Sequence, residues 1–131
     1  MKDKIRNIFI RETSNDLALI QEEIVNNAKE IIPEGLVEKV FRAMHTIKGS
    51  GPMFGFSHLS DVALPVEKVY KELYNGEGQT NKQLVEKTSD VINLLQKALT
   101  ECDAHVPNSN EERALIEFFN NICPFNAGSD D

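Results

Sequence analysis

Apolar side chains recur at steps of three and four residues through most of the chain, and no stretch alternates apolar and polar residues as a half-buried strand would. This periodicity predicts amphipathic helices, each of which must bury its apolar stripe against a neighbour. Short connections between such helices favour an antiparallel bundle. We therefore expect an all-α fold, with helices at about residues 4–28, 34–52, 57–75, 81–103 and 109–122.

Local signals mark the expected ends and weak points of these helices. Ser57 is a candidate N-cap for the third helix, and Ser109 with Glu112 has the spacing of a capping box before the fifth. Pro65 interrupts the third stripe and should kink that helix or loosen one turn. The polar residues 12–16 leave open a break in the first helix, whose expected buried stripe is Ile5, Ile8, Phe9, Leu17, Ile20 and Ile24.

Length and charge limit the classes of function. The 131 residues suit one domain, which we place at residues 1–123, followed by a disordered acidic tail at residues 124–131. Lys and Arg total 14 and Asp and Glu total 21, so the net charge of −7 argues against a nucleic-acid partner. No run of about 18 apolar residues could span a membrane, and the charged start is unlike a secretory signal. Two cysteines suit a reducing compartment, so we expect a cytoplasmic protein.

His45 stands out because the helical periodicity turns it away from the core. Successive residues are separated by about 100° around a helix, and the buried stripe of the second helix centres between Val40 and Met44. His45 then lies more than about 90° away, on the exposed side. Lys48 follows one turn later beside it, and Gly49 occupies the same outward face without a side chain.

This grouping suits phosphoryl transfer. Imidazole is a nucleophile near neutral pH, with an unperturbed pKa of about 6.5. An ammonium group one turn away can stabilise the negative charge that a phosphoryl group would bring. A glycine in the next turn leaves room for another protein's active site to approach the histidine.

The residues His45-x-x-Lys48-Gly49, followed by Phe-Gly-Phe at positions 54–56, resemble the histidine phosphotransfer (HPt) domains of two-component signalling. They look most like the N-terminal phosphotransfer domain of bacterial chemotaxis histidine kinases. The resemblance implies an antiparallel four-helix bundle with an additional short C-terminal helix. It also implies that His45 accepts a phosphoryl group on Nε2, that Lys48 stabilises the phosphate, and that Gly49 gives a receiver domain room to dock.

The same resemblance implies a role for Glu67. It falls where the chemotaxis domains place a glutamate that is hydrogen-bonded to Nδ1 of the histidine, which fixes the tautomer and makes Nε2 more basic. The chain departs from the family pattern nearby. Leu64 occupies the position of a second histidine, and Pro65 lies two residues before Glu67.

The expected function is that of a phosphoryl carrier. His45 would receive the group from a histidine kinase or a receiver aspartate and pass it to the aspartate of another response-regulator receiver domain. Because no ATP-binding motif is present, we expect no enzymatic activity of the chain alone, no cofactor and no metal. Two alternatives remain: a helical interaction adaptor that transfers nothing, and a phosphotransfer fragment of a larger hybrid or chemotaxis histidine kinase.

Three other features favour structural explanations. Cys102, His105 and Cys123 are too few for the four well-spaced ligands of a zinc site. The glycines between residues 49 and 55 lack the preceding strand and the Lys-Ser/Thr ending of a phosphate-binding loop. Phe54 and Phe56 are expected to anchor the core.

Overall fold

The computed structural model describes residues 2–27, 31–101 and 109–122, and this part of the chain is all-helical, without a strand. The expected all-α class is confirmed. The elements are α1 (Lys2–Asn27), α2 (Glu34–Ser50), a 3₁₀ turn η1 (Gly51–Phe54), α3 (Ser57–Tyr74), α4 (Lys82–Thr100) and α5 (Asn110–Ile122).

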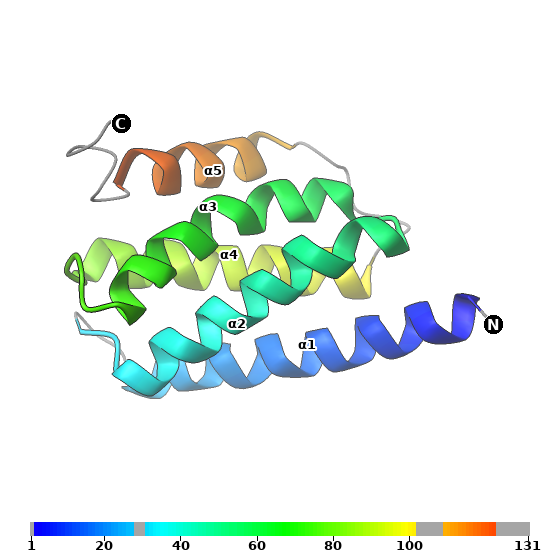
Figure 1. Cartoon of the computed structure of the whole chain (residues 1–131), viewed down its shortest axis with the longest axis horizontal. Coiled ribbons are helices and arrows are strands. Elements are labelled where there is room, and N and C mark those ends of the chain that lie inside the picture. Colours follow the sequence, from blue (N-terminus) through cyan, green and yellow to red (C-terminus); the bar gives the residue numbers. More distant parts are fainter. Residues whose placement is uncertain (1, 28–30, 102–108, 123–131) are drawn as a thin grey trace.

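The helices lie lengthwise beside one another, and the chain reverses direction from each helix to the next (Figure 1). α2 packs most extensively against α3, and α1 packs against α4 and α2. α5 lies on the outer side of α3 and also contacts α4. Among the helices that the structure describes, none covers the outward side of α2 (Figure 1).

α1 runs through the polar residues 12–16 as one helix, so the break that the sequence left open is absent. α3 continues through Pro65 to its end at Tyr74, close to the expected end at residue 75. The expectation that Ser57 caps α3 is wrong: Phe56 occupies the cap position, and Ser57 is the first helical residue. The backbone carbonyl of Phe56 accepts hydrogen bonds from the backbone amides of Leu59 and Ser60, with N···O distances of 2.9 and 3.2 Å.

Side-chain caps open the last two helices. The Asn81 side chain accepts a hydrogen bond from the amide of Leu84 at 2.8 Å, where α4 begins. The Ser109 hydroxyl accepts one from the amide of Glu112 at 3.2 Å, which is the serine half of the expected capping box. Each cap satisfies one amide that the first turn of a helix leaves without a carbonyl partner.

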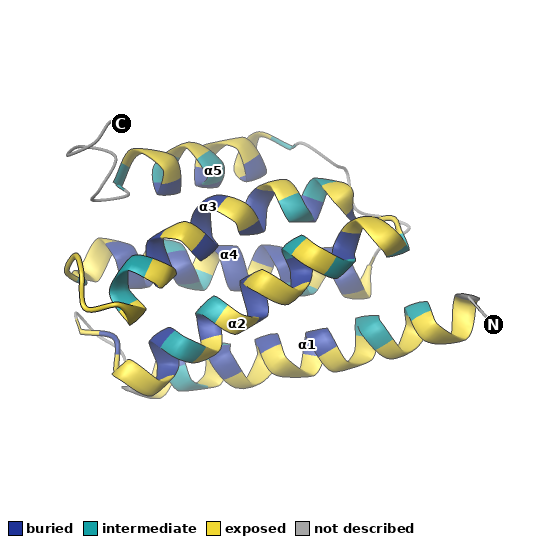
Figure 2. Cartoon of the chain, in the orientation of Figure 1, coloured by how far each residue is buried: buried dark blue, intermediate teal, exposed yellow. Residues whose placement is uncertain are grey.

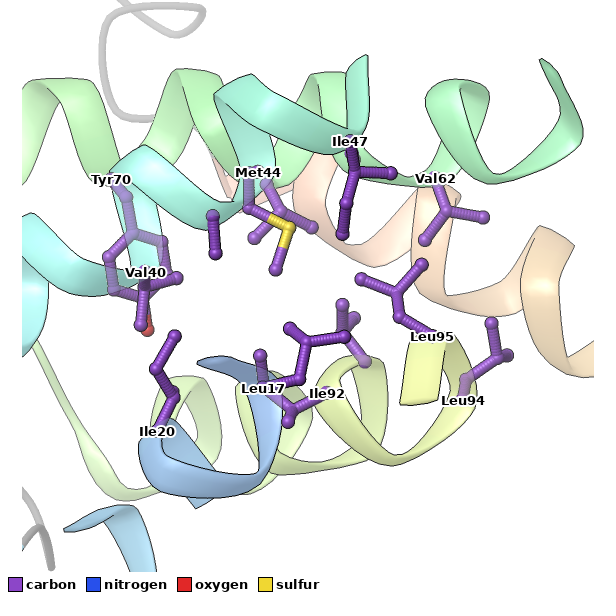
Figure 3. Close-up of a cluster of buried hydrophobic side chains, with 14 of the residues drawn as sticks. Leu17, Ile20, Val40, Met44, Ile47, Val62, Tyr70, Ile92, Leu94 and Leu95 are labelled. Atoms are coloured by element: carbon purple, nitrogen blue, oxygen red, sulfur yellow. The ribbon is translucent and has the colours of Figure 1, made fainter. Parts of the chain in front are cut away.

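The core forms where the apolar stripes of the helices meet, and the buried positions lie on the faces that the helices turn toward one another (Figure 2). Figure 3 shows side chains from α1, α2, α3 and α4 interleaving at the centre. Burial of one such Leu, Ile or Met side chain contributes about 1.5–3 kcal/mol. The core residues with no exposed surface include Leu17, Leu36, Val40, Met44, Ile47, Leu59, Val66, Ile92 and Leu95.

The first turns of α1 correct the expected stripe. Ile5 and Ile8 are 50% and 36% exposed, not buried. Figure 1 shows the reason, because the start of α1 extends beyond the ends of the neighbouring helices. Phe9 from the same stripe is partly buried and stacks on Phe54, with ring centroids 5.0 Å apart. Phe56 is buried in the core, as expected.

One buried polar pair crosses the core and generates a prediction. The hydroxyls of Tyr70 and Thr88 lie 2.6 Å apart, and both residues are buried. We expect Tyr70→Phe to lower the free energy of unfolding by about 1–3 kcal/mol, because the Thr88 hydroxyl then remains buried without this partner. Adding Thr88→Val should recover part of the loss, since the buried hydroxyl is then removed as well.

Urea unfolding followed by circular dichroism measures these changes. Tyr74→Phe, at a tyrosine that is 44% exposed, serves as the control and should leave stability unchanged. A double variant that is less stable than Tyr70→Phe alone would contradict this account of the pair.

Candidate functional site

The outward side of α2 presents the imidazole of His45 to solvent. Its side chain is 66% exposed, while Ala43, Met44 and Ile47 of the same helix are buried in the core. The helical period explains this difference, because positions 43, 44 and 47 share one face and position 45 lies on another. The inward side chains of α2 therefore hold the helix in place without contributing to the chemistry of its outer side.

Glu67 of α3 contacts both His45 and Lys48, the two polar side chains on the outward side of α2. The residue is 7% exposed, and its carboxylate oxygen Oε2 lies 2.7 Å from Nδ1 of His45. The other oxygen, Oε1, lies 2.7 Å from the ammonium nitrogen of Lys48. The three side chains thus meet across the contact between α2 and α3, and Pro65 does not prevent Glu67 from reaching them.

The protonation of this cluster follows from its geometry. Burial alone would raise the pKa of the Glu67 carboxyl, but the hydrogen bonds from Lys48 and His45 outweigh it and leave the pKa below its ordinary value. Glu67 is therefore ionised at neutral pH and can only accept hydrogen bonds. Nδ1 of His45 must then carry the proton, and in the neutral ring Nε2 keeps a free lone pair.

Lys48 has a partner that the sequence reasoning missed. The spacing along the helix places its ammonium beside His45, yet in the structure Glu67 binds that ammonium directly. The side chain of Lys48 is 34% exposed, so it borders solvent while remaining paired. No local pattern contains this pair, because its two residues lie on different helices.

Gly49 leaves the surface next to the histidine open. A Cβ atom at this position would meet nothing within 4 Å, apart from the helix's own backbone.

One residue earlier, the carbonyl of Lys48 accepts a hydrogen bond from the Ser60 hydroxyl at 3.0 Å. This bond ties the end of α2 to the first turns of α3 and fixes the level at which Glu67 faces His45.

An aromatic side chain also contacts the histidine, and the sequence reasoning did not connect the two. Phe41 precedes His45 by one helical turn, and their ring centroids lie 6.4 Å apart. Phe41 in turn stacks on Tyr74 of α3. Their ring centroids lie 5.8 Å apart, and their planes are inclined at 21°. The four-residue spacing between Phe41 and His45 is typical of neighbours on one helix face. The apolar periodicity, however, assigns Phe41 only to the buried stripe of the second helix.

The remaining candidates contribute no chemistry that the structure reveals. Leu64, at the position of the family's second histidine, is 40% exposed and has no polar group to offer. The glycine-rich run forms the end of α2 and the turn η1, which closes at Gly55 with a φ of 92° that favours glycine. Within the described ranges, no three His, Cys, Asp or Glu side chains group as metal ligands. Cys102, His105, Cys123 and the predicted tail at 124–131 lie outside those ranges.

Known proteins share sequence with this chain. The sequence matches the model of the Hpt domain over residues 4–105. Chemotaxis protein CheA of Bacillus subtilis is 29% identical over 99 residues, which make up 76% of this chain and 14% of that protein. CheA of Salmonella typhimurium is 26% identical over 115 residues, or 88% of this chain and 16% of the relative.

CheA of Borreliella burgdorferi is 25% identical over 97 residues, which cover 74% of this chain and 11% of that protein. The chain therefore spans less than a fifth of the length of each of these relatives.

In the part of the chain that the structure describes, none of the helices combines the length and the apolar character needed to cross a membrane.

The lowered pKa of Glu67 predicts a pH dependence. A carboxyl whose pKa is lower in the folded state stabilises the fold above its ordinary value of 4.5, and this contribution disappears as the pH falls through the folded-state pKa. We expect wild type to be more stable than Glu67→Gln at pH 7, with a gap that narrows below about pH 4.5. Urea unfolding of both proteins between about pH 3 and pH 7 measures the gap. A gap that stays constant over this range would show that the folded state does not lower the pKa of Glu67.

Proposed function

Because the chain belongs to the Hpt domain family, whose members take part in histidine phosphotransfer in two-component signalling, we propose that His45 is its phosphoryl-accepting residue. The observation that carries this proposal is that the two nitrogens of the His45 ring differ in their surroundings. Nδ1 is bonded to the buried carboxylate of Glu67, while the ring is largely exposed and keeps a free lone pair on Nε2. The nucleophilic nitrogen is thus the one that another protein can reach.

The transfer step follows from this arrangement. The lone pair of Nε2 attacks the phosphorus of an acyl phosphate on a receiver aspartate, or the terminal phosphorus of ATP held by a kinase. A P–N bond forms as the P–O bond breaks, and the electron pair leaves with the aspartate carboxylate or with ADP. The ring keeps its proton on Nδ1 and becomes cationic, and the carboxylate of Glu67 stabilises that charge at 2.7 Å.

Lys48 completes the proposed site. Its ion pair with Glu67 keeps the ammonium within one helical turn of His45 before any phosphate arrives. A phosphoryl group on Nε2 adds oxygens that an ammonium group binds through charge-assisted hydrogen bonds. At the same time, the newly cationic ring takes over part of the pairing with Glu67. Lys48 can therefore turn toward the phosphate without leaving the buried carboxylate uncompensated.

We place this chemistry in a phosphoryl carrier of the cytoplasm rather than in a kinase. The partners are a histidine kinase domain, in the same or another polypeptide, and the receiver domain of a response regulator. In this proposal α1 to α4 form the family's antiparallel four-helix bundle within a domain at residues 1–123, and α5 is the additional helix that lies on α3. The length of the CheA relatives is compatible with a carrier that works beside separate kinase domains.

The direct test is the replacement of the acceptor. We expect His45→Gln to abolish phosphorylation, measured as incorporation of acid-labile, base-stable phosphate from a phosphorylated receiver. Loss of the bond to the ionised Glu67 should cost about 1.5–3 kcal/mol, too little to unfold a domain of ordinary stability. The matched control is His58→Gln on α3, which should still be labelled. A His45→Gln protein that incorporates phosphate on a histidine would refute the assignment.

Docking can be separated from chemistry at Gly49. We expect Gly49→Gln to block exchange with receiver domains, because its side chain would stand in the approach to Nε2, while phosphoramidate still labels His45. Stability should hold or rise by up to about 1 kcal/mol, since the position is helical and has open space around it.

The control for this variant is Gly35→Gln in the first turn of α2, where an added Cβ also meets nothing within 4 Å. It lies about 21 Å along the helix from position 49 and should not affect transfer. Normal receiver transfer in Gly49→Gln would show that the docking surface lies elsewhere, and failure of both donors would assign the glycine to the geometry of the histidine itself.

A further inference from the structure

We propose that Phe41, braced by Tyr74, is a positioning residue that orients the imidazole of His45 for attack through Nε2. This inference rests on the proposed function, because it assigns a task within the same transfer step. It is carried by the row of three rings that runs from α3 onto α2, in which Tyr74 stacks on Phe41 and Phe41 contacts His45.

An exposed histidine side chain needs two restraints to present one nitrogen in a fixed direction. Its ring turns about two side-chain bonds, and the bond from Nδ1 to Glu67 fixes the position of a single ring atom. With the side chain 66% exposed, solvent offers no further restraint. In the described part of the chain, Glu67 and Phe41 are the hydrogen-bonding and aromatic partners recorded for His45.

Phe41 is placed to supply the second restraint. Side chains in a helix lean toward its N-terminus, so the ring at position 45 lies over the residue one turn earlier. The centroids of Phe41 and His45 are 6.4 Å apart with planes inclined at 45°, within the range of a tilted ring contact. Rotation of the imidazole away from Glu67 would have to break this contact as well as the hydrogen bond.

Tyr74 keeps Phe41 itself from moving. Phe41 is partly buried at the edge of the core, and the Tyr74 ring covers it in a nearly parallel stack at 5.8 Å. Tyr74 is 44% exposed and belongs to the last turn of α3, so its ring extends the contact between α2 and α3 out to the surface.

Four variants test this assignment: Phe41→Leu, Tyr74→Leu, Tyr74→Phe, and Phe118→Leu as a control. Phe118 is also partly buried and in contact with another ring, but it lies on α5. Two measurements are made on each protein: the ¹⁵N chemical shifts of Nδ1 and Nε2 of His45 with the ring neutral, which report the tautomer, and the rate of labelling by phosphoramidate.

We expect Phe41→Leu to reduce the share of the tautomer with the proton on Nδ1 and to slow labelling by about two- to tenfold, the size of an aromatic contact. Tyr74→Leu should change both quantities in the same direction but less. Tyr74→Phe keeps the stacked ring and should match wild type, as should Phe118→Leu.

Wild-type tautomer shares and labelling rates in folded Phe41→Leu would overturn the proposal. So would slower labelling with an unchanged tautomer, because that pattern indicates a merely structural effect. If Phe41→Leu does not fold, the comparison of Tyr74→Leu with Tyr74→Phe decides, and equal behaviour of those two overturns it. If wild type accepts no phosphate at all, the proposed function fails, while the nitrogen shifts still report whether Phe41 orients the ring.

Discussion

The carboxylate of Glu67 bonds with one oxygen to Nδ1 of His45 and with the other to the ammonium of Lys48, each at 2.7 Å. The ionised carboxylate of a buried residue is stable only when both oxygens have partners, so the two helices must pack with these side chains at one level. The packing of α2 on α3 and the pairing of this carboxylate therefore depend on each other. The orientation of the His45 ring and the position of the Lys48 ammonium both follow from it.

The two sides of α2 differ in what they contact: one packs in the core, and the other faces solvent. Its inner side contributes Val40, Met44 and Ile47 to the core, all without exposed surface. Its outer side carries His45, Lys48 and Gly49, whose substitution removes little buried apolar area. Substitutions on the outer side can leave the core intact, because the two sets of residues lie on different faces of the helix. The variants on the outer side therefore test the chemistry without removing core packing.

Charge is distributed in a way that serves the same site. The chain has a net charge of −7, which would disfavour a phosphoryl group at a random surface position. At His45, however, the nearest carboxylate is already compensated by Lys48. In the proposed transfer, the phosphorylated ring would become cationic, and its hydrogen bond to Glu67 would become an ion pair. Lys48, one turn along the same helix, thus offsets the charge of the carboxylate next to His45.

The local features of the site could be predicted from the sequence, because they depend on positions within one helix. The 3.6-residue period places His45 outside the core stripe, with Lys48 and Gly49 beside it. Periodicity could not reveal that Glu67 binds both His45 and Lys48, or that Phe41 lies between His45 and Tyr74, although the family resemblance pointed to the first of these pairings. It also assigned Ile5 and Ile8 to the core, although they lie where α1 extends past its neighbours. Such contacts depend on how far one helix is shifted along another, and that shift is set by the packing of core side chains from distant parts of the chain.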